Sequence, residues 1–260
     1  MKFKIKFNLI FLALLFFINP SWAKNSLPDI ETYKYTNNAR KKIASSLSSW
    51  AKIQLDRLNE EAVIISRSGS TITRIFDKTN LGHSGIVIKD PEYKTWMVYS
   101  LFSNPDTKHR YFYIKRTSLY DFFYNQPDFQ KRCILFIPKK DLQPNLRQIL
   151  ISGNYNKIIG DKTKYNLISS SENTESVNCV EWIFLNLYAA KLNTFDAKII
   201  IKTINKENDI KPIRLPLIMK PFLKMYPNVF IEELPKDRKV KTLMVQDLYK
   251  NNLIQKKITY

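Results

Sequence analysis

Five short apolar segments with the character of β-strands come before one long apolar helix in this chain. The segments span residues 62–66, 84–89, 95–102, 111–115 and 132–138. Each is rich in β-branched or aromatic residues and ends at a turn-forming or polar stretch, as strands do. Residues 178–191 carry apolar side chains at helical spacing, with Ser176 or Asn178 as the capping residue. Strands that follow one another directly and then give way to helices indicate an α+β fold, and we expect a curled antiparallel sheet packed against helices.

The remaining segments divide the chain into three parts after its first 23 residues. Residues 37–61 have an amphipathic pattern, with Ile43, Leu47 and Leu55 on the apolar side. Shorter helices are predicted at 119–124 after Ser118, at 141–153 after Asp141, and at 245–250. A strand is predicted at 229–234 and a polar loop at 160–175. We therefore expect an N-terminal helical segment (24–61), a core (62–200) and a C-terminal extension packed on that core (201–260).

The first 23 residues have the three parts of a cleavable signal peptide. Lys2, Lys4 and Lys6 precede the apolar run 9–18, and Ser21 and Ala23 place small side chains at the two positions that a signal peptidase recognises. The alternative is a transmembrane anchor, but a bilayer-spanning helix needs about 20 apolar residues. We expect cleavage after Ala23, which would leave residues 24–260 as a soluble periplasmic or secreted protein without a transmembrane segment.

The chain is strongly basic, with 42 Lys and Arg against 23 Asp and Glu and a formal net charge of +19. Such a charge favours anionic partners, namely cell-wall polymers, phospholipid headgroups or nucleic acid. The alternative is the composition of a proteome rich in Lys, Asn and Ile. The basic residues are scattered and form no recognisable nucleic-acid module, so we expect no specific nucleic-acid partner.

Two cysteines and two histidines limit the catalytic chemistry that the chain can carry. In an oxidising compartment Cys133 and Cys179 could form one disulfide, or one could be structural and the other reactive. Cys179 lies in the first turn of the helix 178–191, where the free N–H groups and the helix dipole favour a thiolate. His83 stands at the entrance of a strand between glycines, whereas His109 lies in a polar stretch.

These residues indicate a thiolate–imidazole pair of the kind that cysteine hydrolases use, although a buried structural cysteine fits them as well. The two histidines and two cysteines stand in unrelated settings, so no metal site is expected. Five glycines leave no Gly-rich phosphate loop, and we expect no cofactor.

The order of three motifs carries a family resemblance. Arg67-Ser68-Gly69 ends one strand, Gly82-His83-Ser84-Gly85-Ile86-Val87 opens the next, and Asn178-Cys179 opens a late helix with Trp182 three residues on. This order resembles the exported bacterial domain-of-unknown-function family 2145, over about residues 62–190 and more weakly over 221–248.

More distantly, the same order resembles the circularly permuted branch of the papain-like, NlpC-type superfamily, in which a His-x-Gly strand precedes the cysteine helix. That resemblance implies a papain-like core with Cys179 as nucleophile and His83 as base. Relatives hydrolyse amide bonds in peptidoglycan or transfer acyl groups on lipids.

Three further residues complete the candidate site, each with an alternative role. Ser100 occupies the place of the residue that orients the histidine, where His, Glu or Gln would be expected; a serine can accept from the imidazole but carries no charge. Tyr165 could donate to an oxyanion, or simply pack. Arg67 could line the cleft and attract a carboxylate or phosphate, or be an ordinary surface arginine.

Three functions follow from this sequence. The first is a papain-like thiol hydrolase or acyltransferase that acts on a cell-envelope amide, ester or thioester through Cys179 and His83. The second is a non-catalytic domain of the same fold that binds an anionic cell-wall or lipid component through its basic face. The third is a purely structural protein in which Cys133 and Cys179 form a disulfide.

Overall fold

The computed structural model describes residues 30–69, 77, 79–103, 111–126, 130–160, 163–172, 175–215, 237 and 239–260, with side chains from residue 37 onward. The chain divides into two compact units, Met1–Ala39 and Arg40–Tyr260. The sheets, both hydrophobic clusters and every residue of the candidate site belong to the second unit. The signal peptide expected at 1–23 and the strand expected at 229–234 both lie outside the described residues.

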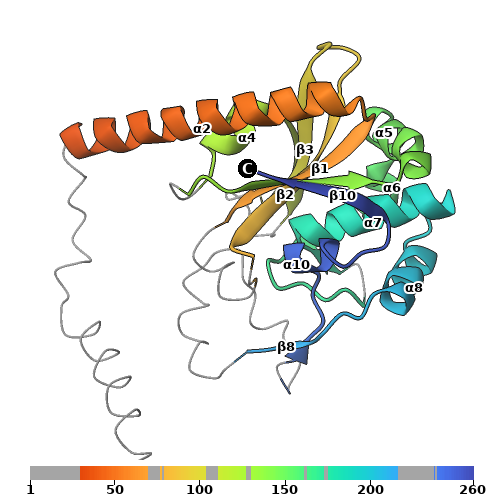
Figure 1. Cartoon of the computed structure of the whole chain (residues 1–260). Helices are drawn as coiled ribbons and strands as arrows, with labels where there is room; N and C mark the ends of the chain where they lie inside the picture. The colour runs from red at the N-terminus through yellow and green to blue at the C-terminus, as the bar shows by residue number, and fades with distance from the viewer. Residues whose placement is uncertain are drawn as a thin grey trace, which may run out of the picture. The chain divides into compact units, whose positions relative to one another are not determined.

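A six-stranded antiparallel sheet forms the centre of the second unit (Figure 1). Its strands lie in the order β10-β5-β1-β2-β3-β4. Their bounds are β1 Ala62–Ser68, β2 Leu81–Lys89, β3 Trp96–Ser103, β4 Phe112–Ser118, β5 Cys133–Pro138 and β10 Ile254–Thr259. All five strands predicted from the apolar segments are present, whereas β10, which is rich in lysine and glutamine, was not predicted. The α+β class is thus confirmed.

The expected curling of the sheet is wrong. β4 and β10 are the two edges of the sheet and do not pair with each other, so the sheet stays open and is not strongly curled (Figure 1). A sheet curls strongly when its edge strands approach closure. Here the C-terminal strand β10 instead extends the sheet beyond β5.

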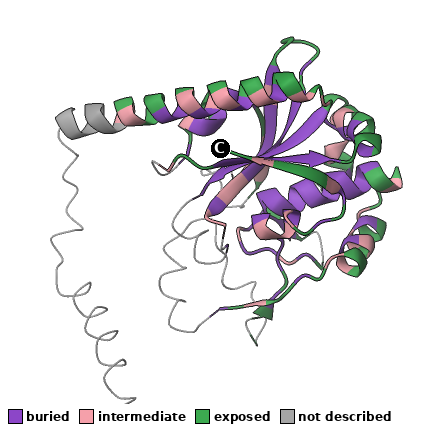
Figure 2. Cartoon of the chain, in the orientation of Figure 1, coloured by how far each residue is buried: buried purple, intermediate pink, exposed green. Residues whose placement is uncertain are grey.

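One face of the sheet is covered by the late helices (Figure 2). The central helix of this layer is α7, Cys179–Leu192, and every residue from Cys179 to Ala190 in it is buried. Around it lie α5 (Gln143–Ile151), α6 (Tyr155–Ile158), α8 (Ala197–Glu207) and α10 (Val245–Leu248). Their apolar side chains form one cluster with Ile64, Ile86 and Ile88 of the sheet. We call this side the α7 face.

The other face is covered by one short helix and by the part of a longer helix that belongs to the second unit. α2 runs from Ile30 to Leu58, and α4, Leu119–Tyr124, follows β4 directly. Residues from Ile43 to Leu55 of α2 and Phe122 and Phe123 of α4 form a second cluster with Val63, Ile65 and Val87. We call this side the α4 face. Neighbouring residues of β1 and β2 thus point to opposite faces, as the two-residue period of a strand requires.

Local signals in the sequence set several element ends. Ser118 caps α4, since its hydroxyl accepts the N–H of Asp121 at 3.0 Å, as predicted. Of the two capping residues predicted for α7, Asn178 is the one that caps it. Asp141 does not cap a helix over 141–153; a 3-10 turn, η2 at Lys140–Leu142, leads into α5 instead.

The described remainder contains short strands. β6 (Lys164–Tyr165) lies in the expected polar loop and pairs with β7 (Ser176–Val177), while β8 (Ile213–Arg214) pairs with β9 (Lys239–Val240). No helix among the described residues is both long and apolar enough to cross a bilayer.

Candidate functional site

Cys179 is the first residue of α7 and lies on the α7 face of the sheet. The Asn178 side chain accepts the N–H groups of Val180 and Glu181 at 2.8 and 2.9 Å, which fixes the helix start. The cysteine is 2% exposed and belongs to the cluster of that face. It borders a cavity of about 20 Å³, shared with Leu81, Gly82 and Met244, which has room for about one water molecule.

The thiol of Cys179 is neutral at physiological pH. Burial raises its pKa from 9.0 to about 11, although the Ser84 backbone N–H, the Arg67 charge and the first N–H groups of α7 all lower it. The expected effect of the helix terminus is therefore present but smaller than the cost of desolvating a thiolate. The prediction of a lowered pKa is wrong in this conformation.

His83 lies on the α4 face. Its ring centroid is 4.6 Å from that of Phe102 and 5.6 Å from that of Phe122, which belongs to the cluster under α2 and α4. Its Nε2 atom is buried and has no hydrogen-bond partner. Burial, together with the charge of Arg67, holds the pKa of His83 well below 6.5, so the imidazole is neutral.

The structure does not bring Cys179 and His83 together on one side of the sheet. In β2, Ile86 and Ile88 point to the α7 face and Val87 points to the α4 face. By the same alternation Ser84 shares the face of Cys179, and His83 lies on the other face, where its ring contacts place it. The imidazole is therefore not positioned to accept the thiol proton.

Arg67 lies beside His83, not at the surface. The two residues are Cα partners across β1 and β2, and Arg67 is only 3% exposed. Its guanidinium donates to the carbonyl oxygens of Ser68 and Asn125, each at 3.2 Å, and its central carbon lies 5.1 Å from the Phe122 ring centroid. Burial lowers the pKa of Arg67 to about 9, which leaves it charged at neutral pH.

Ser100 is fully buried on β3 and does not orient the imidazole. It shares the α4 face with Val98, and its Oγ has no hydrogen-bond partner. The Oγ1 of Thr117 on the adjacent strand β4, opposite Val98, is likewise buried and without a partner.

Tyr165, by contrast, is on the Cys179 side. It is 7% exposed in the cluster of the α7 face, and burial raises its pKa well above 10, with the groups of Cys179 and Glu181 adding to the rise. Of the five predicted site residues, the structure thus places Cys179 and Tyr165 on one face and groups Arg67, His83 and Ser100 on the other.

The two cysteines are free and buried. Cys133 is the first residue of β5 and belongs to the cluster of the α4 face, whereas Cys179 belongs to that of the α7 face. The sheet separates them, so the disulfide that the sequence left open is not formed.

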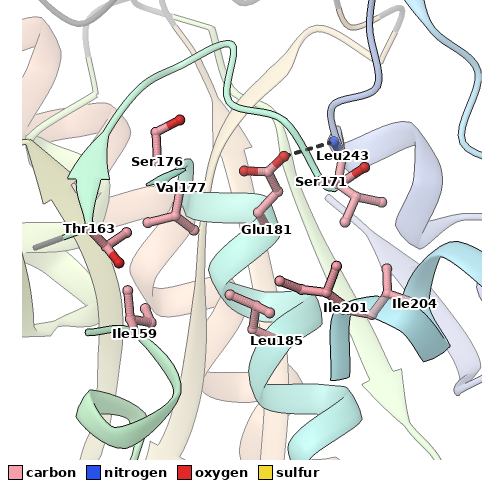
Figure 3. Close-up of a pocket in the computed structure, with 10 residues that line it drawn as sticks. All are labelled: Ile159, Thr163, Ser171, Ser176, Val177, Glu181, Leu185, Ile201, Ile204 and Leu243. Atoms are coloured by element: carbon pink, nitrogen blue, oxygen red, sulfur yellow. Dashed lines mark hydrogen bonds between the residues drawn. The ribbon is translucent and has the colours of Figure 1, made fainter. Parts of the chain in front are cut away.

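A buried carboxyl group, Glu181, lies one helical turn beyond the cap of α7. It borders a second cavity of about 20 Å³, lined also by Thr163, Ser171 and Leu243 (Figure 3). The Ser169 hydroxyl and the Asn178 N–H donate to it, and the Leu243 N–H does so at 3.5 Å. Sequence reasoning missed this residue, although Asn178-x-x-Glu181 has the spacing of a capping box. No comparable sequence pattern pointed to the buried Thr117.

Within the described ranges, no three His, Cys, Asp or Glu side chains gather as a metal site would require.

Comparison with known proteins gives a family but no characterised relative. No curated protein and no solved structure matches the chain. A model of the family described as "Uncharacterized protein conserved in bacteria (DUF2145)" matches residues 54–215, which include β1 to β5, α7 and all five predicted site residues. Because this match covers more than half of the 260 residues, the chain belongs to the DUF2145 family.

Proposed function

We propose that this protein is an exported, non-catalytic domain that binds an anionic component of the bacterial cell envelope. The observation that carries the proposal is that the sheet separates Cys179 from His83. A cysteine hydrolase needs a general base beside its nucleophile, and His83 is not in that place. The neutral, buried state of the thiol supports the same reading. Export rests on the signal peptide at 1–23, and a papain-like core rests on the order of β2 and α7.

The charge of the protein supplies the attraction. The chain has a formal net charge of +19. On α8, Lys198, Lys202 and Lys206 recur every fourth residue and are exposed, while Ile200 and Ile204 between them are buried. A helix with this pattern presents a row of cations to solvent, and such a row binds polyanions with a strength that falls as salt rises.

Sedimentation with isolated wall sacculi and with vesicles that contain anionic lipid tests the proposal. We expect the mature protein to bind at least one of them, to release with rising salt, and to ignore neutral vesicles. Cys179→Ala should bind as the wild type does, whereas the triple variant Lys198→Gln, Lys202→Gln, Lys206→Gln should bind more weakly. Salt-insensitive binding, or loss of binding in Cys179→Ala, would contradict the proposal.

Thiol chemistry separates this proposal from the hydrolase. Denatured, unreduced protein should show two free thiols, because both cysteines are free in the structure. In the native state both should react slowly with iodoacetamide near neutral pH, because burial raises the pKa of Cys179 to about 11 and that of Cys133 well above 9.0. Rapid and selective alkylation of native Cys179 would restore the hydrolase reading.

A further inference from the structure

Arg67 is a buried cation without a buried counter-charge in the described part of the chain. Its two hydrogen bonds go to neutral backbone carbonyls, and Nε has no partner. None of the ion pairs between described residues includes it. Burial of a charge without a partner of opposite sign is costly, so such groups occur where a ligand or an ion supplies the missing charge.

A further unpaired polar atom lies beside Arg67 on the same face of the sheet. His83 Nε2 is buried and lacks a hydrogen-bond partner, and His83 is the Cα partner of Arg67 across β1 and β2. Arg67 Nε and His83 Nε2 can both donate a hydrogen bond, provided that His83 carries its proton on Nε2. Buried polar atoms are almost always paired in native proteins. Two adjacent unpaired donors, one of them on a buried cation, therefore indicate a missing anionic acceptor.

We propose that Arg67 and His83 form a subsite on the α4 face for a single monoanionic oxygen group, a carboxylate or a phosphodiester. This inference rests on the proposed function and names the group by which the envelope component is held. One negative charge neutralises Arg67, whereas a dianion would leave a buried excess of charge. His83 and Phe102 are each only half-buried and form the described rim through which the group enters.

The aromatic rings fit this role. Phe122 lies under the guanidinium, and Phe102 and Phe122 flank the imidazole. An apolar wall on these sides strengthens hydrogen bonds to a bound oxyanion, because water is excluded and the local dielectric constant is low. Wall peptides would offer carboxylates and phospholipids would offer phosphodiesters, so the same site can be tested with small models of each.

NMR titration of the mature protein with acetate, dimethyl phosphate and sulfate, at constant ionic strength, tests the subsite. The chain has two histidines, so His109 serves as the internal control for His83. We expect acetate or dimethyl phosphate to saturate, to shift the His83 resonances and to raise the pKa of His83, because an anion beside it offsets the repulsion by Arg67. Sulfate should act at least tenfold more weakly. Whichever monoanion binds more tightly identifies the carboxylate or the phosphodiester as the group recognised.

Arg67→Met should weaken this binding at least tenfold, while Arg214→Met, at an exposed arginine of β8, should leave it unchanged. If neither acetate nor dimethyl phosphate shows saturable binding, or if Arg67→Met binds them as tightly as the wild type does, the proposed subsite is wrong. Should Arg67→Met fail to fold, the wild-type titration decides alone. Salt-sensitive binding to sacculi or vesicles without any response of the His83 resonances would contradict the subsite and support the proposed function. A saturable response of His83 to a monoanion, without binding to sacculi or vesicles, would support the subsite and contradict the proposed function.

Discussion

At the scale of single residues, Glu181 shows how burial changes the chemistry of a common capping residue. Its carboxylate closes the capping box of α7 and is also reached by Ser169 and by Thr242 and Leu243 of the C-terminal segment. It thus connects three parts of the chain that are distant in sequence. Burial nevertheless raises its pKa from 4.5 to about 7, because these hydrogen bonds only partly offset the desolvation of the charge.

Glu181 should therefore make stability fall as pH rises. The folded chain keeps a proton that the unfolded chain releases near pH 4.5, so stability present below that pH is lost progressively up to about pH 7 and stays lost above it. A pKa change of this size corresponds to roughly 3 kcal/mol. Glu181→Gln retains the capping acceptor but does not ionise. The test measures the free energy of unfolding in urea at pH 4.5 and pH 7. The stability of Glu181→Gln relative to the wild type should increase by roughly 3 kcal/mol between these two pH values.

The exposed Glu172, which pairs with Lys241, supplies the matched control. Glu172→Gln should differ from the wild type by an amount that hardly changes with pH, since exposed ion pairs contribute little. An advantage of Glu181→Gln that stays constant with pH, or shrinks as pH rises, would show that the carboxyl is not held in its neutral form.

At the scale of elements, Gly85 sets how closely β2 and β3 approach. A Cβ atom at this position would lie 2.6 Å from Val98 Cγ1 and 2.8 Å from the Tyr99 carbonyl oxygen. The carbonyl belongs to the backbone of the neighbouring strand and cannot move without displacing that strand. Glycine is therefore needed here for close packing of the two strands that carry His83 and Ser100.

Gly85→Ala should destabilise the protein by about 2 kcal/mol, the usual cost of overpacking a core. Gly160 is the control, because nothing lies within 4 Å of a Cβ atom placed there and its φ is not in the left-handed region. Gly160→Ala should leave the midpoint of urea unfolding nearly unchanged. If Gly85→Ala shifts the urea midpoint no more than Gly160→Ala does, β2 and β3 can separate without loss of stability and the close approach is not required.

The elements themselves were largely predictable where the local signal was strong. The buried strand β5 is a continuous apolar run, β1 begins with one at 62–65, and Asn178 marks the start of α7 by its capping chemistry. β10 was missed because an edge strand exposes most of its side chains and need not be apolar; its central residues, Lys256 and Lys257, are exposed. α8 was missed although its sequence carries a signal, since Asp196 caps it and Ile200 and Ile204 recur at helical spacing.

At the scale of the whole molecule, the candidate site depended on which face of the sheet each residue takes. Sequence motifs identified Arg67, His83 and Cys179, and the structure places Ser84, the residue after His83, close enough for its N–H to act on the Cys179 sulfur. The β1–β2 register is regular from Ala62 to Arg67, so simple alternation places His83 on the face opposite Ile86 and Ile88. The order of motifs does not say which face of the sheet the cysteine helix covers, and it therefore could not predict that His83 and Cys179 lie on opposite sides.

The C-terminal strand completes the sheet and joins it to the helix on the α4 face. β10 pairs with β5, whose six residues are all buried, and the Tyr260 N–H donates to the Cys133 carbonyl at 3.0 Å. The ring of Tyr260 meets that of Trp50 on α2 edge-on, with centroids 5.4 Å apart, and its hydroxyl lies 2.7 Å from Ser46 Oγ. Residues beyond the family match at 215 thus protect an otherwise open, apolar strand edge.

Deletion of residues 254–260 should therefore cost several kcal/mol, through the lost ladder and the exposed β5, and should promote self-association, because an uncovered apolar edge strand pairs with other chains. Urea unfolding and gel filtration measure the two effects. Tyr260→Ala separates the strand from the contact with α2. Tyr260 is 41% exposed, so we expect this variant to lose at most about 1 kcal/mol of stability and to remain a monomer. If the truncated chain stays monomeric and unfolds at the wild-type urea concentration, β10 is dispensable and β5 must be protected by other means.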